Sequence, residues 1–203
     1  MSVRIGVEGL VYSTMTTEDS ISTAPTYAAT TQAPGVISIN INPNGSVETL
    51  FADDGPMESA STLGKIEVEV KKAALSTQNQ ADLLGHTIDA NGGLVCSDTD
   101  VPPYVAVGFK TLKSNGKYKY TWLYKGKFTE PESQNETKGE SISYQTDTIK
   151  GQFVKLTHPV TIGGKSLRPW KYDIDEDDTL ANAVTIAKWF TAPVMPSSTK
   201  DVS

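Results

Sequence analysis

The stretch YVAVGFKTLKSNGKYKYTWLYKGKF, residues 104–128, decides the fold. Asn115-Gly116 stands between two runs rich in β-branched and aromatic residues, and Asn-Gly is the strongest short signal for a two-residue hairpin turn. Such a turn places Phe109 opposite Trp122 and Val107 opposite Tyr124. We therefore expect a core hairpin with a solvated face that carries Lys110, Lys119 and Lys125, and one buried face that carries Val105, Val107, Phe109, Tyr118, Tyr120, Trp122 and Tyr124.

Further strands are predicted on both sides of this hairpin. Residues 65–70 alternate apolar and acidic side chains, as a half-buried strand does, and residues 36–42 are rich in β-branched side chains. Additional strands are expected at residues 141–146, 151–157 and 167–172. Short strands separated by turns predict a mainly β (α+β) fold, a β-sandwich or barrel with one or two packed helices.

Two helices interrupt the strands. Ser76 is a suitable N-cap for a helix over residues 77–84, and Gly85 is a suitable C-terminal stop. Asp178 or Thr179 is expected to cap a second helix that Pro193 ends. The carboxylates at 175–178 would complement its dipole, and Leu180, Val184, Ala187 and Phe190 would form its packing stripe.

Residues 43–64 are predicted to form a long loop between two strands. They show no clear strand or helix period, contain four acids and no base, and include the turn signal Asp54-Gly55-Pro56. Loops of this length in compact domains are usually functional or disordered. The apolar residues Leu50, Phe51 and Met57 favour ordering on a partner, and the alternative is a poorly ordered surface loop.

Composition predicts one domain over residues 1–203, with an extended arm or loop at 14–35 and a mobile tail at 193–203. No apolar run approaches the roughly 20 residues that span a bilayer, so we expect no membrane partner. Glu8 lies where a signal peptide would be apolar, which predicts synthesis in a cytoplasm. The single cysteine, Cys96, permits no internal disulfide and is expected to be a small buried residue.

The net charge of −6 is unevenly spread along the chain. Residues 1–64 hold seven acids and one base, residues 104–127 hold six lysines and no acid, and residues 173–178 hold five acids. This asymmetry favours head-to-tail contacts between copies of the chain. The alternative is that the charged faces only keep the protein soluble.

The sequence predicts no catalytic, cofactor or metal site, and therefore no enzyme. His86 and His158 are far apart and lack metal-ligand spacing. The acids at 173–178 lack the central glycine and terminal glutamate of an EF-hand, which favours a helix cap. Aromatic residues and lysines alternate in the hairpin, but a nucleic-acid platform would need both on one face.

Several segments, in order along the chain, resemble the major tail proteins of long, non-contractile-tailed bacteriophages (siphophages). They are LFADDGPME (50–58), GKIEVEV (64–70), ADLLGH (81–86), VPPYVAVGFK (101–110), WLYKGKF (122–128), ETKGESI (136–142), DEDDT (175–179) and WFTA (189–192). The likeness is weakest over residues 14–35, 157–168 and after Pro193.

The resemblance implies a structural virion protein of the phage tail. Such proteins form stacked, generally hexameric rings that make the tail tube, with tape-measure and tail completion proteins as partners and the genome passing through without specific binding. It implies an inter-ring contact for the 43–64 loop, through Leu50, Phe51, Asp53, Asp54, Gly55, Pro56, Met57 and Glu58. The alternative is a monomeric β-sandwich that binds carbohydrate or protein on a virion.

Overall fold

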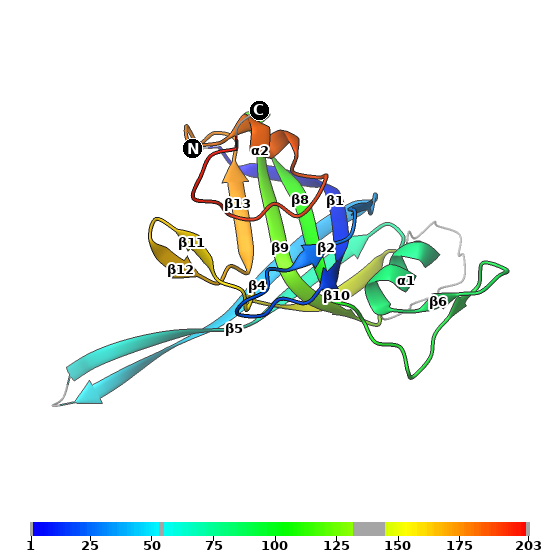
Figure 1. The fold of residues 1–203 in the computed structure, drawn as a ribbon, viewed down its shortest axis with the longest axis horizontal. Coiled ribbons are helices and arrows are strands. Elements are labelled where there is room, and N and C mark those ends of the chain that lie inside the picture. Colours follow the sequence, from blue (N-terminus) through cyan, green and yellow to red (C-terminus); the bar gives the residue numbers. More distant parts are fainter. Residues whose placement is uncertain (1, 53–54, 132–144, 202–203) are drawn as a thin grey trace, which may run out of the picture.

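A nine-stranded antiparallel sheet forms the body of the protein in a computed structural model that describes residues 2–52, 55–131 and 145–201 (Figure 1). The path of the sheet is β2-β1-β8-β9-β10-β5-β4, with β13 beside β9 and β3 beside β1. Its strands are β1 (Arg4–Thr17), β2 (Thr26–Tyr27), β3 (Thr31–Gln32), β4 (Val36–Ala52), β5 (Gly55–Lys72), β8 (Val105–Lys113), β9 (Tyr118–Thr129), β10 (Asp147–Val154) and β13 (Lys171–Asp175). Two small hairpins, β6 (Thr87–Ile88) with β7 (Leu94–Val95) and β11 (Val160–Ile162) with β12 (Lys165–Leu167), stand apart from it. The predicted mainly β fold is confirmed.

The sheet curls so that β4 comes close to β1, and its central strands β1, β8 and β9 contribute side chains to a core on each face. The inner core gathers apolar side chains of β1, β5, β8, β9, β10 and α1 (Thr77–Leu84). A second core lies on the other face of β1, β8 and β9, around Trp122 and Trp189, where α2 (Ala183–Ala187) and the C-terminal segment cover it. The result is a sandwich-like body with two apolar layers.

Three glycines in neighbouring strands make room for aromatic rings directly opposite them. Gly108 pairs with Trp122, Gly126 with Phe153, and Gly151 with Phe128. A Cβ atom at any of these glycines would lie 2.8 Å or less from the facing ring. Close packing of this kind leaves no space for a larger residue.

The β8–β9 hairpin forms as predicted, but its register differs by one residue. The turn holds three residues, Ser114 to Gly116, with Gly116 in the left-handed region at φ 80°. Gly108, not Phe109, therefore lies opposite Trp122. Since a one-residue slip exchanges the faces of a strand, the predicted single face is wrong: Val107 and Phe109 enter the inner core, whereas Tyr120, Trp122 and Tyr124 enter the second core.

The first helix matches its prediction, and the second does not. Ser76 caps α1 by accepting a hydrogen bond from Asn79 N, and Gly85 ends the helix in the left-handed region. The second helix, α2, is only Ala183–Ala187 and has Asn182 as its N-cap. Leu180 is exposed rather than packed. Asp173, Asp175 and Asp177 contact lysines, and Asp178 accepts a hydrogen bond from Leu180 N in a turn before α2.

Residues 43–52 and 55–64 form no loop: they extend β4 and β5 into one long hairpin, which corrects the prediction. The pairing runs from Val36 opposite Lys72 to Ala52 opposite Gly55. Cross-strand hydrogen bonds, which no local sequence pattern reveals, hold these residues extended.

Other predicted segments also differ in the structure. Residues 14–17 continue β1, and the segment after them folds back to form β2 and β3 against β1. Where a mobile tail was predicted, Val194 O accepts a hydrogen bond from the Tyr124 hydroxyl, and Asp201 accepts one from Thr185. One strand, β10, spans the gap between the predicted strands at 141–146 and 151–157; residues 141–144 lie outside the described residues. Cys96 is exposed, not buried.

Candidate assembly surfaces

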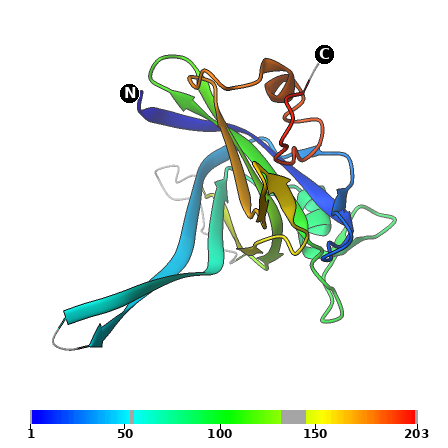
Figure 2. The ribbon, with the colours of Figure 1, turned by 60° about the vertical axis from the view of Figure 1, so that its left-hand side comes forward.

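The β4–β5 hairpin projects far from the body as a two-stranded ribbon (Figures 1 and 2). At its root, Ile66, Val68 and Val70 point into the inner core and are fully buried. Beyond Pro43 the side chains with a described environment are nearly all exposed, Val47 to 70% and Leu63 to 49%. The fold thus anchors the root firmly and leaves the distal part uncovered by the rest of the described chain.

An exposed ribbon of this length gains stability when another chain covers it. A two-stranded hairpin alone is marginally stable in water. Its outer edges carry backbone N–H and C=O groups that can pair with another chain. Within the ribbon, Ser46 and Thr62 share a hydroxyl hydrogen bond of 2.9 Å, which is too weak a contact to replace a core.

The predicted inter-ring residues gather at the end of this ribbon. Leu50 lies opposite Glu58, and Phe51 opposite Pro56, so the backbone brings them together at the far tip. Gly55 begins β5, and Met57 follows in the same strand. Asp53 and Asp54 lie outside the described residues.

All five predicted core residues of the β8–β9 hairpin, Val107, Phe109, Tyr120, Trp122 and Tyr124, are buried. They divide between the two cores instead of sharing one face. The hairpin therefore separates the two apolar cores. These aromatic side chains are buried and do not form a surface for a ligand.

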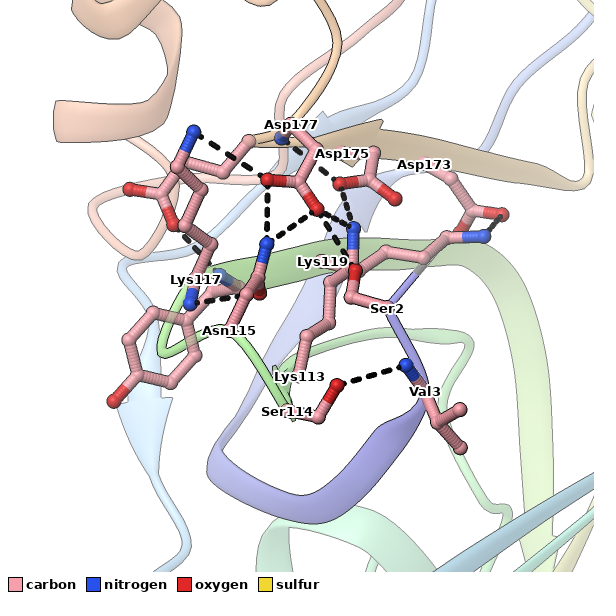
Figure 3. A network of polar contacts seen from close by, with 12 residues as sticks. Ser2, Val3, Lys113, Ser114, Asn115, Lys117, Lys119, Asp173, Asp175 and Asp177 are labelled. Carbon is pink, nitrogen blue, oxygen red and sulfur yellow. Dashed lines mark hydrogen bonds and ion pairs between the residues drawn. The ribbon is translucent and has the colours of Figure 1, made fainter.

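The basic and acidic segments of the chain neutralise each other within one subunit. Lys113 Nζ lies 2.6 Å from Asp175 Oδ1 and also contacts Asp177, while Lys119 Nζ lies 3.1 Å from Asp173 (Figure 3). Hydrogen bonds from Lys113 and Asn115 hold the pKa of Asp177 well below its ordinary value. The opposite charges that suggested contacts between copies meet inside the same molecule.

A buried ion pair ties the N-terminal segment to the body. Lys125 Nζ lies 2.6 Å from Asp19 Oδ1, and both side chains are almost wholly buried. Burial alone raises the pKa of Asp19, but hydrogen bonds from Lys125 and from the backbone N–H groups of His158 and Thr157 outweigh it, so the pKa is lowered. Lys125 was predicted to be solvated; its burial follows from this pairing.

The protein thus combines a mainly β body that has two cores with one long ribbon whose described distal side chains are mostly exposed. A sequence model of the phage tail tube protein family matches residues 8–185. The chain therefore belongs to the phage tail tube protein family: it is a structural protein of the virion tail that self-assembles into a tube. A comparison with curated proteins gave no match. Neither helix of the described chain is long and apolar enough to cross a membrane.

Proposed function

We propose that copies of this chain, made in the host cytoplasm, close into rings of six and that the rings stack into the tail tube. The tube conducts the genome, encloses the tape-measure protein during assembly, and ends at tail completion proteins. Head-to-tail contacts of this kind build rings by rotation and a tube by translation. Membership of the tail tube family supports the proposal.

The β4–β5 ribbon is the observation that carries the stacking role. It is rooted in the inner core, extends away from the body, and has no covering layer in the described chain. In a stacked assembly such a ribbon can reach the adjacent ring, where its edges and faces gain the contacts that they lack in one subunit.

A groove beside the root of the ribbon is a suitable acceptor for the tip of a neighbouring ribbon. Its lining combines apolar side chains with two basic ones: Val7, Ile39, Ile41, Pro43, Phe109, Trp170, Arg4 and Lys171, together with Thr111. The tip segment 50–58 has the complementary composition of apolar residues and acids, with no base. Arg4 is the more suitable basic partner, because Lys171 pairs with Asp173 and the hairpin lysines Lys113, Lys119 and Lys125 also pair within the subunit.

Shortening the ribbon tests the stacking role. Thr49 lies directly opposite Ser59, so Asn-Gly can replace residues 50–58 and close a two-residue turn without changing the register below it. We expect the wild-type chain to form tubes that sediment at high speed, and the shortened chain to remain as subunits or single rings. A matched control carries Lys165→Ala in the separate β11–β12 hairpin and should sediment like the wild type. Normal tubes from the shortened chain would contradict the stacking role.

The acceptor groove has its own test. Arg4→Glu reverses one charge in the groove and should weaken sedimentation of tubes while leaving the melting temperature nearly unchanged, because Arg4 is exposed. Unaltered tube formation by this variant would exclude Arg4 from the contact.

A further inference from the structure

Three side chains with metal-binding atoms converge next to α1, on elements that the sequence separates widely. His86 follows the Gly85 cap of α1, Cys96 follows β7, and Glu130 follows β9. One ligand atom from each of them lies within 4.8 Å of the other two. This cluster takes no part in the tube contacts described above, and it lies near α1, on the opposite side of the body from the ribbon (Figure 1).

The histidine of this cluster is oriented as metal-binding histidines are. His86 Nδ1 lies 2.7 Å from Asp100 Oδ2, and Asp100 is itself held by a 2.8 Å hydrogen bond from Ser97 N. A carboxylate on Nδ1 fixes the imidazole so that Nε2 is presented to a metal. Nε2 lies 3.0 Å from Glu130 Oε2, so a nitrogen and an oxygen donor already stand side by side.

The set of donors selects the class of ion. An imidazole nitrogen, a thiolate and a carboxylate oxygen suit Zn²⁺, whereas Mg²⁺ and Ca²⁺ take oxygen ligands only. The imidazole is 6% exposed, whereas the Glu130 side chain is 62% exposed and Cys96 is also open to solvent. The cluster therefore has a buried histidine on one side and is open to solvent on the other.

We propose that His86 Nε2, Cys96 Sγ and Glu130 bind one zinc ion, with Asp100 as a positioning residue behind the histidine. Zinc binding would draw the donor atoms, which lie within 4.8 Å of one another, to ligand distances of about 2.0–2.3 Å from the ion. The ion would join three separate segments: the end of α1, the β6–β7 segment (residues 86–101) and the end of β9.

The β6–β7 segment lacks the apolar packing that stabilises the rest of the body. Val95 and Val101 are both at least half exposed, and the turn at residues 89–93 is held mainly by hydrogen bonds to the Asp89 side chain. Its two ends meet at Gly85, where an added Cβ would lie 2.5 Å from Val101 O. A bound ion would hold the β6–β7 segment in place, which no hydrophobic core does there.

Titration of the untagged full-length chain with zinc chloride, under a reductant that does not bind metals, tests the proposal. Calorimetry should show one ion per chain. Cobalt chloride should give a thiolate-to-cobalt charge-transfer band that Cys96→Ser abolishes. His86→Gln and Glu130→Gln should each weaken zinc binding at least tenfold, and Asp100→Asn should weaken it by about 10-fold, the usual effect of removing a partner behind a metal-binding histidine.

Asp98→Asn, which removes a neighbouring exposed acid that does not contact His86, is the matched control and should bind zinc like the wild type. Cys96 and Glu130 are solvent-exposed, so their variants should keep the wild-type circular dichroism. Absence of saturable one-to-one binding would overturn the proposal. Loss of binding in Cys96→Ser with normal binding in His86→Gln would overturn it as well, because a lone thiol would then account for the signal.

Discussion

Trp122 shows at the scale of one residue how this sheet is held together. Its side chain is fully buried in the second core, and its indole N–H donates a 3.0 Å hydrogen bond to Trp189 O, next to α2. The ring also fills the space above Gly108 in the neighbouring strand. One side chain therefore joins β8, β9 and the C-terminal segment.

Replacement of Trp122 by alanine should cost about 3–5 kcal/mol of unfolding free energy, because it leaves a large cavity and removes a buried hydrogen-bond donor. Lys119→Ala, three residues before Trp122 in β9, removes only a partly exposed ion pair and should cost less than about 1 kcal/mol. Denaturant unfolding of both variants checks this. Equal midpoints would contradict the placement of Trp122 in the core.

Asp19 should make stability depend on acid pH. Its pKa is lowered in the folded protein, so the stability that it contributes is fully present above the unfolded value of about 3.9 and is lost as pH falls through the folded pKa. Asp19→Asn should therefore be clearly less stable than the wild type at pH 7, and the difference should shrink near pH 3. Denaturant unfolding at both pH values measures it, and a constant difference would contradict the account.

At the scale of elements, the sequence predicts those features that neighbouring residues determine. Ser76 and Gly85 fix both ends of α1, and the sequence predicts them. The β8–β9 register was missed because Asn115-Gly116 forms part of a three-residue turn, and because both faces of the strands are apolar enough to be buried. An alternating pattern specifies register only when one face is polar.

The ribbon and the metal-ligand cluster could not be predicted for a related reason. Residues 43–49 and 62–64 lie outside both cores, so no alternation marks them, and their pairing across the hairpin keeps them extended. His86, Cys96 and Glu130 meet through tertiary folding, so their spacing in the sequence carries no signal. Non-local contacts decide both features.

Shortening the ribbon should change assembly and leave the fold of the subunit intact. The buried part of β5 ends at Ile66, far from the segment 50–58 that Asn-Gly would replace. The melting temperature and circular dichroism of the isolated subunit should therefore stay close to those of the wild type. Unfolding of the shortened chain would show that the distal ribbon contributes to the core.

At the scale of the whole molecule, the charge fits the proposed tube through which the genome passes without binding. The net charge is −6, and the lysines of the β8–β9 hairpin face carboxylates or aromatic rings of the same chain. Proteins bind duplex DNA through unpaired basic groups and lose affinity as salt rises. Gel-shift assays at physiological salt should detect negligible binding, and a salt-sensitive shift would contradict this expectation.

Electron cryo-microscopy of the purified full-length chain at high concentration tests the central claim most directly. We expect hollow tubes of stacked rings in which the β4–β5 ribbon of each subunit contacts the adjacent ring, where it buries surface that is exposed in one subunit. Tubes in which every ribbon stays within its own ring would contradict the stacking role. Uniform single subunits at every concentration would contradict unaided assembly and favour a monomeric binding module.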